Sequence, residues 1–360
     1  MLIIRTPARI SFGGGGTDLP AYYERHNGAV LNAAINKYFY TFLDTREDGR
    51  TQIISSNLGV CETWDDINQV NVTRGTALEI PLAVLREYGC ADGLEVFLAS
   101  ELPAGSGLGC SASMCVSLLQ ALSTCQQMPL TKDELARKAF HITANVLGKP
   151  VGKQDEYAAA HGGLNFIIFD RDGSTCVNPL VLPPQTMAAL QNKLMLFFTG
   201  NTRDSWSILK EQEALSRNGN GSTLESLHRA RELAGRMRTA LEKDDLAGFG
   251  RLLHEGWQWK KKVSSRISNA AIDRLYEVAI GSGAAGGKIT GAGGGGFLLF
   301  YCEEENQSAV REAMTAEGIG EMRFAFDFEG SRVVVNEFVA DREAGKCSLD
   351  LTGRQALAGD

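Results

Sequence analysis

Three short glycine-rich tracts constrain this chain more than any other feature of its sequence. They lie at residues 13–16, 105–109 and 281–296, and together they hold 16 of the 40 glycines in 360 residues. Average usage of about 7% predicts roughly 25 glycines, so the tracts account for the excess. Apolar residues form 44% of the chain and the glycines have no G-X-Y period, which excludes collagen and generic disorder. The sequence therefore predicts a globular protein whose backbone turns tightly, or approaches something closely, at three places.

Charge and apolar patterning narrow the class of protein. The net charge of −7, with 22% charged residues, gives no long-range attraction for nucleic acid or anionic lipid. No run reaches 18 apolar residues, and the apolar stretch at the start is too short for a signal peptide. The eight cysteines form no C-x-x-C pair, so neither a zinc ribbon nor a redox dithiol is indicated. We expect a cytoplasmic protein that binds neither nucleic acid nor membranes.

Hydrophobic periodicity predicts a β-rich first half and a helical segment after Gly200. Strands are expected at 2–12, 29–43, 51–56, 94–99, 164–169, 193–199, 297–302, 321–327 and 331–337, and helices at 114–127, 131–147, 205–216, 223–243, 245–263, 269–281 and 305–316. Prolines near 180–195 mark the expected boundary between domains of residues 1–190 and 191–340. Residues 341–360 are polar and are expected to form a loose tail.

The second tract lies within PAGSGLGCSAS (103–113), between an expected strand and an expected helix. Its glycines let several backbone N–H groups converge, its serines add hydroxyls, and the helix N-terminus adds partial positive charge. These are the ingredients of a phosphate-binding loop. No lysine closes the loop, so it is not a Walker A motif. The alternative is an ordinary strand-to-helix turn with a serine cap.

The third tract matches the dinucleotide fingerprint G-x-G-x-x-G twice. An expected helix precedes the tract and an expected strand follows it, which is the reverse of the order that the fingerprint requires. We expect instead a loop that lets the main chain approach a triphosphate or a substrate, with Lys288 and Thr290 contributing side chains. The alternative is a packing loop between closely apposed elements.

The first tract, within PARISFGGGGTDLP (7–20), brings Arg9, Thr17 and Asp18 to one flexible turn. A guanidinium and a carboxylate at such a turn suit a phosphoryl donor on one side and a hydroxylic acceptor on the other. A surface ion pair with an Asx turn is the simpler alternative for this tract taken alone.

The three tracts in this order, with KITGAGGGGF (288–297) as part of the third, resemble the GHMP kinases. Further segments resemble the branch of D-glycero-D-manno-heptose 7-phosphate kinases: VGKQDEYAAAHGGLNF (151–166), FTGNTR (198–203) and GRLLHEGWQWKKKVSSRISN (250–269). The resemblance extends to about residue 338. It implies an α+β, two-domain GHMP kinase fold, with an N-terminal domain like the second domain of ribosomal protein S5 and a ferredoxin-like C-terminal domain. It also implies ATP and Mg²⁺ in the cleft between them and a sugar phosphate as the acceptor.

The resemblance assigns roles to individual residues. Asp155 matches the catalytic base, and Arg9 matches the basic residue that steadies that base and the transferring phosphoryl group. The implied ATP-binding residues are Gly105, Ser106, Gly107, Leu108, Gly109, Cys110, Ser111 and Ser113, together with Ser55, Ser56 and Asn57; Ser111 is also expected to meet Mg²⁺. The implied substrate-binding residues are Thr17, Asp18, Lys153, Tyr157, Arg203, Gly293 and Gly294, of which Lys153 and Arg203 suit the phosphate of the acceptor.

Two positions depart from the pattern of the family. Cys110 stands where relatives commonly carry serine. Many relatives carry a metal-binding glutamate in the helix before the catalytic base, but residues 141–154 hold no acidic residue, which leaves Thr143, Asn145 or water in its place.

The leading hypothesis is a kinase for the anomeric hydroxyl of a heptose 7-phosphate. A free-sugar kinase acting on fucose, arabinose or galactose is an alternative within the same fold. An ATP-binding regulatory protein that has lost turnover is an alternative from another class. The sequence leaves the choice between a monomer and a homodimer open.

Overall fold

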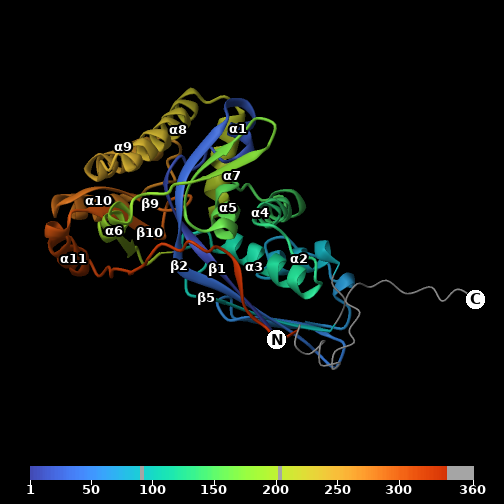
Figure 1. Ribbon diagram of the computed structural model, residues 1–360. Helices are drawn as coiled ribbons and strands as arrows, with labels where there is room; N and C mark the ends of the chain where they lie inside the picture. The colour runs from blue at the N-terminus through green and yellow to red at the C-terminus, as the bar shows by residue number, and fades with distance from the viewer. Residues whose placement is uncertain (90–92, 202–204, 339–360) are drawn as a thin grey trace, which may run out of the picture.

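The computed structural model describes residues 1–89, 93–201 and 205–338 (Figure 1). A large eight-stranded sheet has the strand order β11-β1-β2-β5-β3-β4, with β6 paired to β2 and β7 paired to β6. Its strands are β1 (Leu2–Gly13), β2 (Gly28–Thr45), β3 (Thr51–Ser55), β4 (Val60–Trp64), β5 (Leu94–Ser100), β6 (Leu164–Phe169), β7 (Thr175–Pro179) and β11 (Arg332–Asn336). The long strand β2 pairs with β6 along its first part and with β5 along its last part, so it joins two parts of the sheet.

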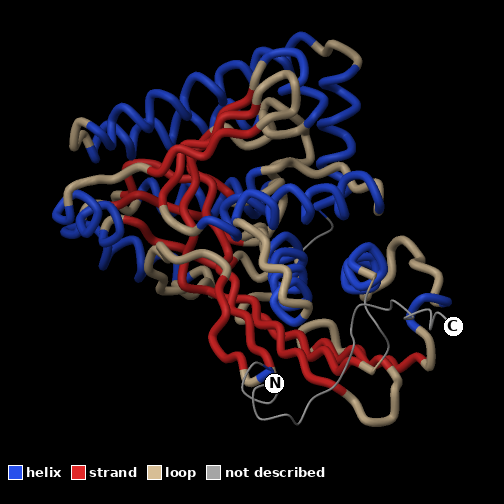
Figure 2. The backbone as a smooth tube through the Cα atoms, turned by 45° about the vertical axis from the view of Figure 1, so that its right-hand side comes forward, coloured by secondary structure: helices blue, strands red, loops and turns tan. Residues whose placement is uncertain are grey.

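Four helices pack on one face of the large sheet and form the first hydrophobic core. They are α2 (Glu79–Tyr88), α3 (Cys110–Cys125), α4 (Lys132–Phe140) and α5 (Gln154–His161). Helix α3 is buried on nearly all sides, because it lies between β1 and β2 on one side and the other three helices on the other. In Figure 2 helices flank the strands on both sides.

A second, three-stranded sheet has the order β8-β10-β9, with β8 (Leu194–Phe198), β9 (Ala284–Ile289) and β10 (Phe297–Cys302). The helices of this part are α6 (Pro184–Asn192), α7 (Ser205–Arg217), α8 (Gly221–Glu242), α9 (Leu246–Lys261), α10 (Ala270–Gly281) and α11 (Gln307–Ala316). Helices α8 and α9 lie side by side (Figure 1) and share a core with the other face of the large sheet, where Met237 and Phe249 meet Phe12 and Leu31. Helices α10 and α11 pack with the small sheet in a third core.

The expected elements are present except for the strand at 321–327. The sequence analysis missed β4, β7, α2, α5 and α6, together with α1 (Pro20–His26) and the short 3-10 turns Ile67–Gln69 and Glu304–Asn306. Helix α5 gave no helical period because its apolar residues include three consecutive alanines, which are buried. The third tract is not all loop: β9 lies inside it, and its glycines let α9 approach closely. A Cβ at Gly286 would lie 2.1 Å from the carbonyl oxygen of Gly250 in α9.

The expected strand at 321–327 was wrong, because this segment runs between the two sheets rather than along either. The Met322 N–H donates to the Leu196 carbonyl of the small sheet (2.7 Å), and the Asp327 N–H donates to the Ala34 carbonyl of the large sheet (3.0 Å). The chain then returns to the large sheet as β11. The expected domain ranges stay a prediction. Strand β11 lies in the expected second range, but it pairs with β1 in the large sheet of the first range.

The helix that begins after Thr131 ends in an unusual turn. Thr131 and Glu134 form a capping box at its start. Its last six residues, His141–Val146, form a π-helical turn in which the Leu147 N–H donates to the Ile142 carbonyl, five residues back (2.9 Å). Such turns are rare and are frequent at functional sites.

Candidate active site

A cavity of about 500 Å³ lies between the large-sheet part and the second part of the chain, and residues of all three glycine tracts line it. Small-molecule sites commonly have volumes of about 300–1,000 Å³. Gly15 and Gly16 come from the first tract, Gly105, Gly107 and Gly109 from the second, and Gly291 from the third. The tracts therefore meet at one site, as the sequence predicted.

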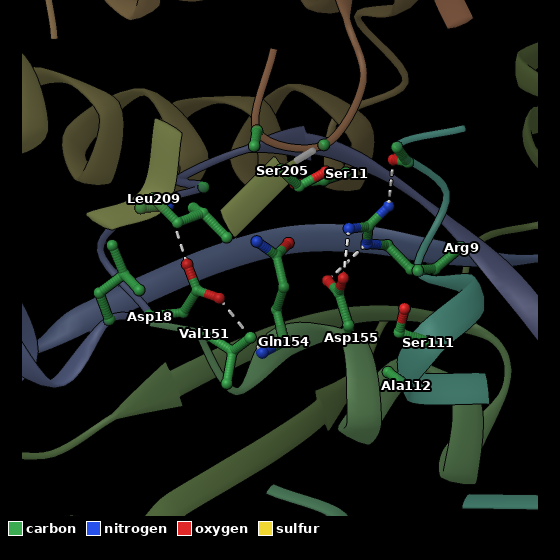
Figure 3. A pocket seen from close by; sticks show the side chains of 18 of the residues that line it. Arg9, Ser11, Asp18, Ser111, Ala112, Val151, Gln154, Asp155, Ser205 and Leu209 are labelled. Atoms are coloured by element: carbon green, nitrogen blue, oxygen red, sulfur yellow. Dashed lines mark hydrogen bonds and ion pairs between the residues drawn. The ribbon is translucent and has the colours of Figure 1, made fainter. Parts of the chain in front are cut away.

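A two-pronged ion pair between Arg9 and Asp155 forms one wall of the cavity (Figure 3). Arg9 Nε lies 2.7 Å from Asp155 Oδ1, and Arg9 Nη2 lies 2.5 Å from Oδ2. Arg9 Nη1 also donates to the Gly107 carbonyl of the second tract (2.7 Å). The Arg9 side chain is 5% exposed and that of Asp155 is 27% exposed. Strand β1 and the first turn of α5 thus hold a fixed carboxylate that still reaches the cavity.

A second carboxylate, Asp18, faces the same cavity and is buried. Its oxygens accept from the N–H groups of Gly16 (2.8 Å) and Gln154 (3.3 Å). Burial raises the pKa of Asp18, and the charge of Asp155 adds to this rise. Figure 3 shows Asp18, Gln154 and Asp155 side by side along the cavity.

Four buried polar atoms in cavity-lining residues have no hydrogen-bond partner among the described residues. They are Ser11 Oγ, Gln154 Oε1, Glu156 Oε2 and Gln212 Nε2. Buried polar groups in proteins are nearly always paired, so unpaired ones at a cavity need an explanation. Donors and acceptors around one concave space suit a ligand that carries several hydroxyl groups. The sequence analysis missed all four residues, because none of them stands in a glycine tract and their types are common on ordinary surfaces.

The second tract lines the cavity with the backbone conformation expected of a phosphate-binding loop. Its three glycines all have positive φ, from +73° to +82°. Helix α3 follows directly, and the first N–H groups of a helix have no partner inside it. The first three helical residues, Cys110, Ser111 and Ala112, line the cavity together with the loop residue Ser106. This donor set fits the phosphates of a nucleotide.

The third tract packs directly on the second. A Cβ at Gly296 would lie 2.2 Å from the Ser106 carbonyl oxygen, and a Cβ at Gly291 would lie 2.6 Å from the Gly107 Cα. The tract is therefore a packing loop and also a wall of the cavity, through Gly291 and Ala292. The packing interpretation is confirmed, and the approach of this loop to a triphosphate or a substrate stays a prediction.

Two lysines approach the cavity from the second part of the chain: Lys288 is buried and Lys260 is half-buried. Lys288 donates to the Phe12 carbonyl (3.1 Å), and Lys260 donates to the carbonyls of Ile289 (3.1 Å) and Gly291 (2.5 Å). Burial lowers the pKa of Lys288 to about 7, and the charge of Arg9 adds to this shift; burial also lowers the pKa of Lys260. A run of three lysines at residues 260–262 is typical of a solvated helix face, but Lys260 is only partly exposed and its ammonium donates to two backbone carbonyls. Such a cluster of cations favours a bound anion.

Replacing Lys288 is expected to change how nucleotide binding depends on pH. Lys288 is charged below about pH 7, and a neighbouring phosphate favours the charged form. ATP affinity of the wild type should therefore fall as the pH rises above about 7, and Lys288→Met should flatten this slope. In the free protein a lowered lysine pKa has the opposite consequence: stability rises with pH from about 7 to about 10.4.

Calorimetry and thermal unfolding across this range check both effects. The matched control is Lys243→Met, since Lys243 is exposed. If Lys288→Met keeps the slope of the wild type, Lys288 is not beside the nucleotide.

Several predicted site residues do not line this cavity. The Thr17 hydroxyl donates to the carbonyls of Gly14 and Ala29, and the Lys153 ammonium donates to the Gly173 carbonyl. The other residues outside the lining are Tyr157, which stacks on His161, and Ser55, Ser56, Asn57, Leu108, Ser113, Gly293 and Gly294. Arg203 lies outside the described residues. Of the two residues proposed in place of the family glutamate, Thr143 lines the cavity and Asn145 does not.

Comparison with known proteins agrees with this site. The family model of the GHMP kinase N-terminal domain matches residues 73–163, and that of the GHMP kinase C-terminal region matches residues 237–320. The chain is 32% identical to a D-glycero-alpha-D-manno-heptose 7-phosphate kinase of Campylobacter jejuni, over 91% of this chain and 96% of the relative. It is 25% identical to a galactokinase of Pyrococcus furiosus, over 88% and 93%.

A solved structure described as a D-glycero-D-manno-heptose 1-phosphate kinase from Bacteriodes thetaiotaomicron superposes with a TM-score of 0.78 at 29% identity, and covers 93% of this chain and 99% of that chain. The chain therefore belongs to the GHMP kinase superfamily and has its two-domain, mixed α/β fold with two sheets. It is a sugar kinase of this superfamily, a phosphotransferase with an alcohol group as acceptor that uses ATP. In the described part of the chain, no helix is both long enough and apolar enough to cross a membrane.

Proposed function

We propose that this protein transfers the γ-phosphoryl group of ATP to the anomeric hydroxyl of D-glycero-D-manno-heptose 7-phosphate. The observation that carries the proposal is that the phosphate-binding loop, the Arg9–Asp155 pair and the unpaired polar side chains face one cavity. Such a site binds a phosphoryl donor and a polyhydroxylated acceptor together. The name of the Campylobacter jejuni relative supports a heptose 7-phosphate as that acceptor.

In the proposed mechanism, the second tract and the first turn of α3 bind the triphosphate, while Asp18 and Gln154 bind sugar hydroxyls. An Asp155 oxygen accepts the proton of the anomeric hydroxyl as the oxygen forms its bond to the γ-phosphorus. The bond from this phosphorus to the β–γ bridging oxygen breaks, and ADP leaves with that oxygen. Arg9 fixes the orientation of Asp155, and Lys288 stabilises the negative charge that spreads over the transferring group.

Magnesium is the metal ion that the proposed activity requires. Ser111, which lines the cavity in the first turn of α3, fits the role of a hydroxyl ligand next to the phosphates. When bound, Mg²⁺ would neutralise charge on the β- and γ-phosphates.

The phosphate of the acceptor needs a cationic partner. Of the described residues that line the cavity, Arg9, Lys260 and Lys288 carry ammonium or guanidinium groups, and Lys260 is not used by the mechanism above. We propose Lys260, together with Arg203, as this partner; Lys153 is the weaker candidate because, unlike Lys260, it does not line the cavity.

A kinetic comparison of acceptors tests the proposed substrate. With ATP and Mg²⁺, kcat/KM for the heptose 7-phosphate should exceed that for the free heptose, the heptose 1-phosphate, galactose, fucose and arabinose by at least about 100-fold, since a charged phosphate contact contributes about 3 kcal/mol. Arg203→Ala should raise KM for the heptose 7-phosphate and leave KM for ATP unchanged. An unchanged KM for the sugar phosphate would remove Arg203 from the site, and a preference for a free sugar would make this a free-sugar kinase.

A further inference from the structure

Glu156 follows the proposed catalytic base in α5 and lines the same cavity. Its side chain is almost completely buried, with 2% of the residue exposed. One carboxyl oxygen, Oε1, lies 3.2 Å from the Thr143 hydroxyl, and the other, Oε2, has no partner among the described residues. A buried carboxylate is costly unless a cation or several hydrogen bonds compensate it. Among the described residues, no hydrogen-bond partner therefore compensates the Oε2 half of this carboxyl group.

The Thr143 hydroxyl is only a weak hydrogen-bond donor to the Glu156 carboxyl group. Thr143 lies in the π-helical turn, and its hydroxyl oxygen is also 3.0 Å from the Ala139 carbonyl and 3.2 Å from the Phe140 carbonyl. A hydroxyl carries a single hydrogen, so these three acceptors compete for it. The carboxyl group is thus held in place with one oxygen unpaired among the described residues, and burial, together with the charge of Asp155, raises the pKa of Glu156 well above its ordinary value.

The position of Glu156 relative to α3 links it to the phosphate-binding loop. Helix α5, which carries Glu156, packs against α3, and the charge of Glu156 adds to the burial that raises the pKa of the Cys115 thiol in α3. Residues four apart in a helix share one face, so Ser111 lies one turn before Cys115 on the same side of α3. Ser111 also lines the cavity.

We propose that Glu156 is the carboxylate ligand of the divalent cation that accompanies the nucleotide, with the Ser111 hydroxyl as the second protein ligand. Kinase sites commonly hold Mg²⁺ through one or two carboxylates and the substrate phosphates. No group of three or more His, Cys, Asp or Glu side chains in the described part of the chain is placed to hold a metal ion. The cation would therefore bind together with the nucleotide rather than to the protein alone. The proposal rests on nucleotide binding at this loop and is independent of which sugar is the acceptor.

Mn²⁺ binding in the presence of a non-hydrolysable ATP analogue, without any sugar, tests the proposal. Glu156→Gln keeps the shape of the side chain and an oxygen for the Thr143 hydroxyl, and it removes the charge. Electron paramagnetic resonance should show Mn²⁺ binding to the variant–analogue complex at least ten-fold more weakly than to the wild-type complex. Affinity for the analogue in EDTA should stay within two-fold of the wild type, and the melting temperature without metal should not fall. Thr143→Val, which removes only the hydroxyl, should change Mn²⁺ affinity less than three-fold.

A relocated carboxylate provides the second variant. Because the Thr143 oxygen lies 3.2 Å from the Glu156 carboxyl group, Thr143→Glu combined with Glu156→Gln returns a carboxylate to the same space. The double variant should recover most of the lost Mn²⁺ affinity. If the single variant does not fold, the double variant still tests the proposal, by its Mn²⁺ affinity relative to the wild type. Unchanged Mn²⁺ affinity in Glu156→Gln, or no recovery in a folded double variant, would overturn the proposal. Failure of the wild type to bind the analogue would instead contradict the proposed function.

Discussion

Asp155→Asn should lower turnover by roughly 10²- to 10⁴-fold while ATP still binds. The substitution keeps the shape of the side chain and removes the carboxylate that accepts the proton of the acceptor, and general-base contributions have this size. The loss should fall on kcat, because Asp155 is not among the residues proposed to hold the triphosphate. Steady-state kinetics with a coupled ADP assay, together with calorimetric titration of an ATP analogue, separate the two effects.

The matched control for this variant is Asp65→Asn, which makes the same chemical change at an exposed residue. It should leave kcat within two-fold of the wild type. Near-normal turnover in Asp155→Asn would remove Asp155 from the role of base. The Arg9 contact would then be a structural ion pair, of the kind that the sequence left open as an alternative.

Gly296→Ala should destabilise the protein by about 3 kcal/mol and abolish most nucleotide binding. The new Cβ would meet the Ser106 carbonyl at 2.2 Å, and the residue has a φ of +92°. Overpacking against backbone costs about 1–3 kcal/mol, and a left-handed conformation adds about 1–2 kcal/mol for a residue with a side chain. Because Ser106 belongs to the phosphate-binding loop, any shift that relieves the clash displaces the loop. Urea unfolding and ATP titration measure the two effects.

Gly235→Ala provides the control, since Gly235 lies within α8 and a Cβ there would meet nothing within 4 Å. Alanine in place of glycine inside a helix stabilises by about 0.5–1 kcal/mol. The two glycines should thus respond with opposite signs. Equal and small effects at both positions would show that the contact between the second and third tracts is not required.

The glycine tracts indicated the position of this site because glycine is needed where backbone segments approach each other closely. The tracts around Gly107 and Gly296 were predicted to act at one place, and they touch each other there. The sequence also indicated Arg9, Asp18 and Asp155, which line the cavity as predicted. Their roles stay predictions until the variants are measured.

Other site residues left no signal in the sequence. Lys260 stands in a run of three lysines, which is typical of a solvated helix face, but α9 packs on β9 and the Lys260 ammonium donates to the Ile289 carbonyl there. Glu156 was overlooked because the search for a carboxylate covered the helix before Asp155 and not the residue after it. The segment 321–327 has the apolar alternation of a strand, but its hydrogen bonds go to two different sheets. Each of these outcomes depends on tertiary contacts that a local pattern does not contain.

Phosphorus NMR of the reaction mixture tests the central claim most directly. The wild-type protein, ATP, Mg²⁺ and D-glycero-D-manno-heptose 7-phosphate are incubated together and the products are followed over time. The account predicts equal amounts of ADP and of a new phosphate resonance that couples to the anomeric proton, while the 7-phosphate signal is retained. Binding of ATP without formation of ADP, with this acceptor and with each free sugar, would contradict the account and indicate an ATP-binding regulatory protein.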